Sequence, residues 1–197
     1  MVQDLHDGST ECGEEFAPPV ERREEQIGWN PPPQGWVQIQ TDGFVLSPSG
    51  KAAAGGLIRD CLGRCSAAFA NNLGNCSITA AELKGAVAGL QMAWDKGYRK
   101  VHLNLDSSTA MSIIRNCSDD DHRHGLLVQH VCNVLNRDWD VVISHVYREG
   151  NRAADYLASL GHSLPFGTHH VDVCSPELCR WLEYDVMGIS QARFINI

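Results

Sequence analysis

The 197-residue sequence lacks the features of several large protein classes. It contains no apolar run approaching the ~20 residues that a membrane-spanning helix requires. Its first residues are acidic, where a secretory signal would be basic and then apolar. Its eight cysteines include no two closely spaced CxxC pairs, which argues against a structural zinc site. We therefore expect a soluble, intracellular protein without a membrane partner.

The sequence also lacks an excess of basic residues, and its net charge is −8. Because phosphate-binding surfaces are usually basic, this balance disfavours tight nonspecific binding to nucleic acid. Residues 1–35 alone carry −6, however, and the other 162 residues carry only −2. Carboxylates that bind divalent cations would also cease to repel phosphate. The acidity therefore does not exclude a nucleic-acid substrate.

Composition divides the chain into three parts. Residues 1–35 are rich in charge and proline, so burial cannot offset the entropy lost on ordering, and we expect a disordered arm. Residues 36–161 have the apolar periodicity of one folded domain. Residues 162–197 are expected to form a tail with one short helix behind Ser175 and Pro176. No internal repeat is visible.

The periodicity in residues 36–161 predicts an α/β fold with the element order βββ-α-β-α-α-β-α. The stretch "WVQIQTD" alternates strictly, which is typical of a half-buried strand with Gln38, Gln40 and Asp42 on one face. A hairpin follows around residues 61–63, and the strongest helical pattern covers residues 79–96. We expect a mixed five-stranded sheet, its first three strands antiparallel, flanked by helices.

Four acidic residues stand at the ends of the predicted strands and at the starts of the predicted helices. Asp42 ends the first strand, Glu82 lies in the first turn of the long helix, Asp106 ends a later strand, and Asp155 follows Asn151 in the first turn of the last helix. Each alone is explained by a turn or by the helix dipole. Clustered carboxylates would repel one another unless cations neutralised them, and oxygen ligands favour Mg²⁺ or Mn²⁺. Two such ions suit phosphodiester cleavage.

These motifs resemble the type 1 ribonuclease H family. The similarity rests on "TDG" after the first strand, "AEL" in the first long helix, "LDS" after the fourth strand, and a histidine ten residues before the aspartate of "GNRAAD". It covers roughly residues 36–161. The stretches "PPPQGWVQIQTDG", "GGLIRD", "HVYREGNRAAD" and "LASLG" particularly resemble the reverse-transcriptase-like ribonuclease H domains of plant retroelement-derived proteins.

The resemblance implies a ribonuclease H-like fold, two Mg²⁺ ions for which Mn²⁺ substitutes, and endonucleolytic cleavage of the RNA strand of RNA·DNA hybrids. Asp42 would bridge both ions, Glu82 and Asp106 would complete the ligands of one, and Asp155 would hold the other, which carries the attacking water. His145 matches the family's mobile histidine, on a loop, which helps proton transfer or product release. We expect a monomer, and the sequence identifies no protein partner.

The sequence also departs from the family pattern. Phe44 stands where the loop that contacts RNA usually has a small residue, and no basic hybrid-binding region lies between Asp106 and Asp155, where "NCSDDDHRHG" is acidic instead. These departures keep open a second hypothesis, a catalytically weak or inactive domain that binds nucleic acid or a protein. A 3′-5′ exonuclease is disfavoured because the first strand lacks a DxE pair.

Overall fold

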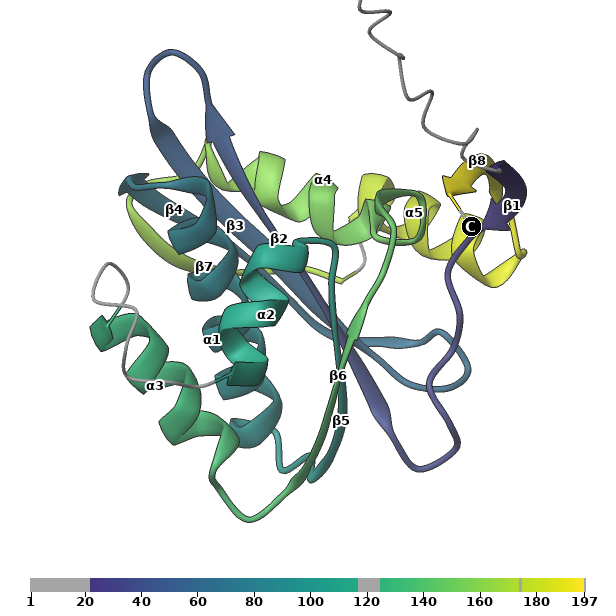
Figure 1. The fold of residues 1–197 in the computed structure, drawn as a ribbon, viewed down its shortest axis with the longest axis horizontal. Helices are drawn as coiled ribbons and strands as arrows, with labels where there is room; N and C mark the ends of the chain where they lie inside the picture. The colour runs from purple at the N-terminus through teal and green to yellow at the C-terminus, as the bar shows by residue number, and fades with distance from the viewer. Residues whose placement is uncertain (1–21, 117–124, 174, 197) are drawn as a thin grey trace, which may run out of the picture.

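The computed structural model of the chain describes residues 22–116, 125–173 and 175–196 (Figure 1). Residues 1–21, most of the predicted arm, lie outside the described residues, as do residues 117–124 with the acidic run from Asp119 to Asp121. In the described part of the chain, none of the helices combines the length and hydrophobicity needed to cross a membrane.

Within the described residues, the main sheet has six strands in the order β6-β5-β2-β3-β4-β7. Consecutive strands β2, β3 and β4 are antiparallel, whereas β5 is parallel to β2, and β6 to β5. The strands are β2 (Val37–Leu46), β3 (Lys51–Arg59), β4 (Cys65–Asn75), β5 (Lys100–Leu105), β6 (Asp140–His145) and β7 (Gly167–Val171). The predicted mixed sheet is confirmed, with a sixth strand, β7, that comes from the predicted tail and extends the edge beside β4.

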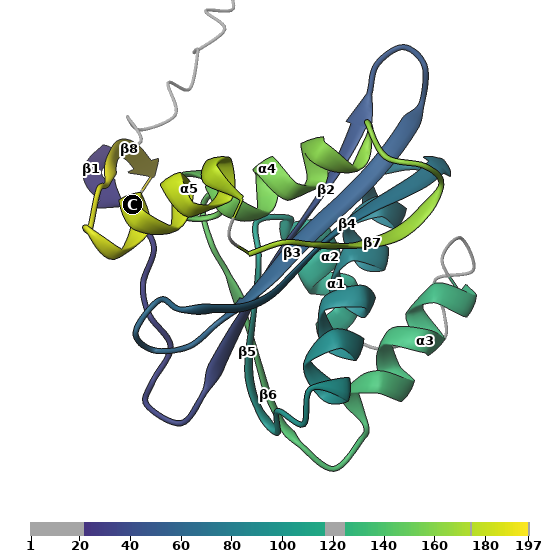
Figure 2. The ribbon, with the colours of Figure 1, turned by 180° about the vertical axis from the view of Figure 1, so that it is seen from behind.

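Helices cover both faces of this sheet, as Figures 1 and 2 show from opposite sides. On one face α1 packs against β2 and β3, with α2 and α3 beside it, and on the other α4 packs against the same strands and α5 continues beyond it. The helices are α1 (Ile78–Asp95), α2 (Ser108–Asn116), α3 (Gly125–Leu135), α4 (Arg152–Gly161) and α5 (Pro176–Val186), with a short 3₁₀ helix η1 (Arg148–Gly150). The helix order agrees with the prediction.

Serine caps begin the two helices that follow β4 and β5. The hydroxyl of Ser77 accepts a hydrogen bond from the Ala80 amide, and the hydroxyl of Ser107 accepts one from the Ala110 amide, both at 3.2 Å. Each cap satisfies an amide that would otherwise lack a partner in the first turn. The cap at Ser107 starts α2 directly after Asp106.

Strand β2 is buried on both faces, and the prediction of a half-buried strand is wrong. Gln38 and Gln40, assigned to the exposed face because they are polar, are 2% and 1% exposed. Helix α4, the 3₁₀ helix η1 and the segment around Trp29 cover that face, and the two amides find hydrogen-bond partners there. Buried polar groups are tolerated when they are paired in this way.

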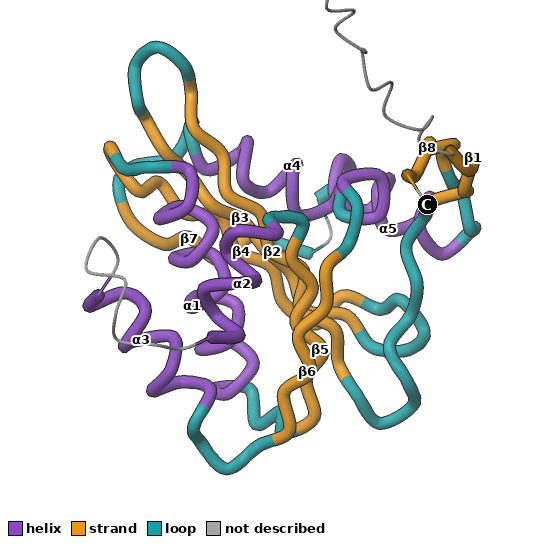
Figure 3. The backbone as a smooth tube through the Cα atoms, in the orientation of Figure 1, coloured by secondary structure: helices purple, strands orange, loops and turns teal. Residues whose placement is uncertain are grey.

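The chain ends form a second, two-stranded sheet that the sequence did not predict. Strand β1 (Arg22–Ile27) pairs antiparallel with β8 (Gln191–Asn196), and Figure 3 shows the two side by side beyond α5. The predicted disordered arm is therefore wrong for residues 22–27. The predicted helix behind Ser175 and Pro176 is confirmed as α5, but the predicted tail missed the strands β7 and β8 on either side of it. Each of β1 and β8 obtains its backbone partners from the opposite end of the chain.

Candidate active site

Asp42 lies inside β2, not at its end, because the strand continues through Leu46. Its neighbour Gly43 is required for close packing and not for a turn. A Cβ atom at Gly43 would lie 2.5 Å from the backbone nitrogen of Glu82. Glycine therefore allows α1 to approach β2 closely, which places the Glu82 side chain, in the second turn of α1, beside the Asp42 carboxylate.

Asp106 joins these two residues through the topology of the sheet. Strand β5 is parallel to β2 with Leu105 opposite Thr41, so the next residues along the chain, Asp106 and Asp42, lie side by side. One carboxylate oxygen each from Asp42, Glu82 and Asp106 lie within 4.8 Å of one another. We call these three residues the carboxylate site. The structure thus brings together three of the four acids that the sequence singled out.

The electrostatics of the carboxylate site disfavour ionisation. Burial, together with the charges of Asp106 and Asp155, raises the pKa of Asp42 to about 8. Burial, with the charges of Asp42 and Asp106, raises the pKa of Glu82 to about 9. Burial also raises the pKa of Asp106, although the Arg148 guanidinium opposes this shift. A cation in the site would reverse these shifts by stabilising the charged forms.

Asp155 faces the same site from greater distance. It lies in the first turn of α4, it is half-buried, and its charge raises the pKa of both Asp42 and Asp106. Helix α4 is fixed by Asn151, whose amide donates to the carbonyl of Thr41 at 3.0 Å and does not cap the helix. The side chain of Asn151 therefore holds the start of α4 next to the strand that carries Asp42.

His145 is the last residue of β6, so its predicted position on a loop is wrong. It pairs with Leu105 across the sheet, and its Nε2 atom lies 3.1 Å from the carbonyl oxygen of Asp106. Its ring packs edge-on against Tyr147, with 5.4 Å between the ring centroids. The imidazole is exposed at the rim of the cavity that Glu82 and Asp106 also line.

Two arginines that the sequence analysis did not select also line this cavity, Arg148 and Arg193. The Nε atom of Arg148 lies 3.6 Å from Oδ2 of Asp106. Arg148 stands inside the motif "HVYREGNRAAD", so its place between His145 and Asp155 was an available signal. Arg193 lies in β8, and nothing in its local sequence indicates a position beside the carboxylate site.

The three carboxylates fit a divalent cation. Both carboxylate oxygens of Asp42, Oε2 of Glu82 and Oδ1 of Asp106 are buried without a hydrogen-bond partner among the described residues. Buried carboxylate oxygens are normally hydrogen-bonded or bound to a metal. An all-oxygen donor set suits Mg²⁺ or Mn²⁺ better than zinc.

Known proteins with similar sequences identify the family to which the chain belongs. A sequence profile of the family described as reverse transcriptase-like matches residues 40–161. A curated protein of Arabidopsis thaliana that carries the provisional name of ribonuclease H protein is 39% identical over 176 residues. The matched region is 89% of this chain but only 28% of that protein, so the chain spans less than a third of its relative.

Solved structures show the same fold. The crystal structure of ribonuclease H1 from the archaeon Halobacterium salinarum matches with a TM-score of 0.60 and 25% identity, over 65% of this chain and 98% of that chain. LC11-RNase H1, solved in complex with an RNA/DNA hybrid, matches with a TM-score of 0.58 and 20% identity, over 63% of this chain and 94% of that chain. The predicted ribonuclease H-like fold is confirmed.

Proposed function

Since the chain belongs to the reverse transcriptase-like family, we propose that it hydrolyses the RNA strand of RNA·DNA hybrids at the carboxylate site. The observation that carries this proposal is the set of three buried carboxylates, Asp42, Glu82 and Asp106, within 4.8 Å of one another and with unpartnered oxygens. Such a cluster destabilises the fold unless it binds cations, so its presence points to a bound metal. Cleavage is endonucleolytic and leaves 3′-hydroxyl and 5′-phosphate ends.

The residues have distinct roles in this proposal. Asp42, Glu82 and Asp106 would hold divalent cations, and Asp155 would contribute to holding a second one. Bound Mg²⁺ or Mn²⁺ supplies Lewis-acid stabilisation of phosphate oxygens and lowers the pKa of water. His145, anchored at the Asp106 carbonyl and exposed at the cavity rim, exchanges a proton with the product or substrate.

The decisive experiment is cleavage of an RNA·DNA hybrid with different labels on its two strands, in Mg²⁺, Mn²⁺ or EDTA. Wild type is compared with Asp42→Asn and with the control Asp95→Asn, which changes an exposed carboxylate at the end of α1. We expect metal-dependent cutting of the RNA strand by wild type and the control, and none by Asp42→Asn. Failure of folded wild type to cut in either metal would refute the proposal.

Isothermal titration calorimetry with Mg²⁺ or Mn²⁺ addresses the number of ions. Two binding events in wild type, with one weakened selectively in Asp155→Asn, would agree with the proposed division of ligands. A single event that is insensitive to Asp155→Asn would remove Asp155 from the ligand set.

A second candidate is a domain that binds nucleic acid without cleaving it, and the position of Arg148 favours it. Its guanidinium lies against Asp106 and offers this carboxylate a protein cation in place of a metal. If Arg148 blocks the site, Arg148→Ala should bind Mn²⁺ more tightly than wild type and gain cleavage activity. If Arg148 instead helps to bind substrate phosphate, the same change should weaken cleavage.

A further inference from the structure

The segment between β6 and α4, residues 146–151, connects His145 to the helix that carries Asp155. It contains Tyr147, whose ring contacts His145, and Arg148, whose guanidinium contacts Asp106. A shift of this segment would therefore move the histidine and the arginine relative to the carboxylate site. What holds the segment in place decides the geometry of that side of the cavity.

The C-terminal strand holds this segment at its exposed side. Nη1 of Arg193, in β8, lies 2.9 and 3.0 Å from the two carboxylate oxygens of Glu149. The same guanidinium lies over the ring of Tyr147, 4.5 Å from its centroid. One side chain thus contacts two residues of the segment, one through an ion pair and the other through its aromatic face.

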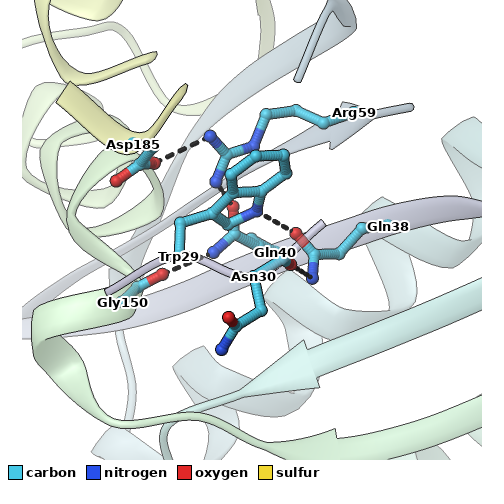
Figure 4. Close-up of polar contacts among 7 residues, drawn as sticks. All are labelled: Trp29, Asn30, Gln38, Gln40, Arg59, Gly150 and Asp185. Atoms are coloured by element: carbon cyan, nitrogen blue, oxygen red, sulfur yellow. Dashed lines mark hydrogen bonds and ion pairs between the residues drawn. The ribbon is translucent and has the colours of Figure 1, made fainter. Parts of the chain in front are cut away.

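The C-terminal helix reaches the same segment by a buried route, shown in Figure 4. Asp185 of α5 accepts a hydrogen bond from Nη1 of Arg59 at 2.7 Å, and Nη2 of Arg59 donates to the side-chain oxygen of Gln40. The amide of Gln40 then donates to the carbonyl oxygen of Gly150 at 2.7 Å. The position of Gly150 is therefore linked through paired side chains to the position of α5.

The N-terminal extension closes the remaining side. A Cβ atom at Gly150 would lie 2.9 Å from the carbonyl oxygen of Gly28, so the two backbones are in close contact. The ring of Trp29 lies 4.2 Å from the Arg59 guanidinium carbon, and its indole N–H donates to Gln38. Because β1 pairs with β8, the N-terminal and C-terminal extensions support each other.

We propose that two extensions outside the family-matched region, residues 22–30 and 176–196, form a clamp on residues 146–151, and that Arg193 is a positioning residue of the active site. Arg193 acts through Tyr147 and Glu149 and keeps His145 and Arg148 in position relative to the carboxylate site. The role in catalysis rests on the proposed hydrolysis, whereas the clamp itself does not.

The test compares full-length wild type, Arg193→Ala and Arg193→Lys. The matched control is Arg180→Ala, since Arg180 is an exposed arginine of α5 that also lies over an aromatic ring, but over that of Trp181 and not over Tyr147. Hydrogen–deuterium exchange of the amides of residues 146–151 reports on the clamp without requiring activity. We expect exchange there to become about tenfold faster in Arg193→Ala, with an intermediate effect in Arg193→Lys and no change in the control. Unchanged exchange in Arg193→Ala would overturn the clamp.

Hybrid cleavage then tests the positioning role. Small misplacements of reacting groups reduce turnover strongly, so Arg193→Ala should lower kcat about tenfold with KM nearly unchanged. In a His145→Ala background, Arg193→Ala should have a much smaller effect, because the residue that it positions is gone. A raised KM with unchanged kcat would show that Arg193 binds substrate directly and would overturn the positioning role. If wild type does not cleave, the proposed hydrolysis fails while the exchange experiment still decides the clamp.

Discussion

Two buried polar clusters lie on the same face of β2, two residues apart. In one of them opposite charges are paired, and in the other like charges meet. Gln40 belongs to the Arg59 cluster, in which Arg59 donates to both Gln40 and Asp185. Asp42 belongs to the carboxylate site, where like charges meet and the oxygens have no hydrogen-bond partner among the described residues. Both environments are desolvated, since Asp185 is 5% and Asp42 1% exposed.

The difference separates a structural cluster from a functional one. Burial raises the pKa of Asp185, but the Arg59 guanidinium opposes that shift, so the protein itself supplies the counter-ion. At the carboxylate site, burial and like charges act in the same direction on Asp42 and Glu82. The Arg148 guanidinium offsets these shifts only in part, so the remaining counter-charge must come from a ligand. Removal of a charge should therefore have opposite effects on stability in the two clusters.

The largest expected effect is at the Arg59 cluster. Asp185→Asn removes the counter-ion of a fully buried arginine that cannot lose its proton at neutral pH. We expect the free energy of unfolding to fall by about 3 to 5 kcal/mol, measured by urea denaturation at pH 8 in EDTA. The control is Asp60→Asn, which weakens the exposed ion pair with Arg64 and should change stability by less than about 1 kcal/mol. Equal losses of stability in Asp185→Asn and Asp60→Asn would show that the buried ion pair contributes no more than the exposed one.

At the carboxylate site, removal of a charge is expected to raise stability instead of lowering it. In EDTA the folded state binds more protons than the unfolded state, because the pKa of Asp42 is about 8 and that of Glu82 about 9 when folded, above their ordinary values. Stability should therefore be highest in mild acid and fall as the pH rises from 5 to 9. Asp42→Asn should be more stable than wild type at pH 9 by on the order of 3 kcal/mol. Urea denaturation across this pH range measures both trends.

Stabilisation by Mg²⁺ should also differ between variants of the two clusters. Binding to the folded state alone stabilises it, so 10 mM Mg²⁺, about a hundred times a typical weak dissociation constant, should add roughly 2 to 3 kcal/mol to wild type at pH 8. Asp42→Asn should gain little from Mg²⁺, and Asp185→Asn should gain as much as wild type. If Mg²⁺ stabilised all three equally, the carboxylate site would not be where it binds.

The next effect concerns the close packing of α1 against Gly43, which brings Glu82 beside Asp42. Gly43→Ala places a methyl group within 2.5 Å of the backbone of α1, which must move away from β2. We expect a loss of about 2 kcal/mol in stability and a weaker stabilisation by Mg²⁺. Gly125→Ala is the control, since no atom of the described residues lies within 4 Å of a Cβ added there. A neutral Gly43→Ala would show that α1 does not depend on this contact.

The carboxylate site was largely predictable from sequence because its residues stand at local landmarks. Asp106 follows an alternating strand and precedes a capping serine, and Glu82 lies near the start of the longest helical pattern, so the local pattern fixes their places in the fold. The reason for Gly43 was missed, since "TDG" reads as a turn and only the packed structure shows α1 against it. His145 was assigned to a loop because the end of β6 depends on its pairing with Leu105.

The Arg59 cluster and the β1–β8 sheet could not be predicted in this way. Arg59 and Asp185 are 126 residues apart, and neither side chain shows in the sequence that it is buried. The stretch "RREEQI" lacks the apolar alternation that identifies a strand, and it becomes one by pairing with residues 191–196. Polar residues on a strand are expected to be exposed, whereas Trp29 pairs with the buried Gln38, and Arg59 and the Gly150 carbonyl pair with the buried Gln40. Such tertiary pairing has no local signature.

The smallest expected effect comes from a substitution that lowers stability near the carboxylate site without changing its charge. Ser77→Ala removes the cap of α1, the helix that carries Glu82, but changes no charge. Loss of a cap costs about 1 kcal/mol, and this loss should be the same at pH 5 and pH 9, since no titrating group is removed. Thermal or urea unfolding at both values measures it. A loss that grew with pH would mean that fraying of the first turn alters the environment of Glu82, and the carboxylate site would then depend on the cap as well as on the packing at Gly43.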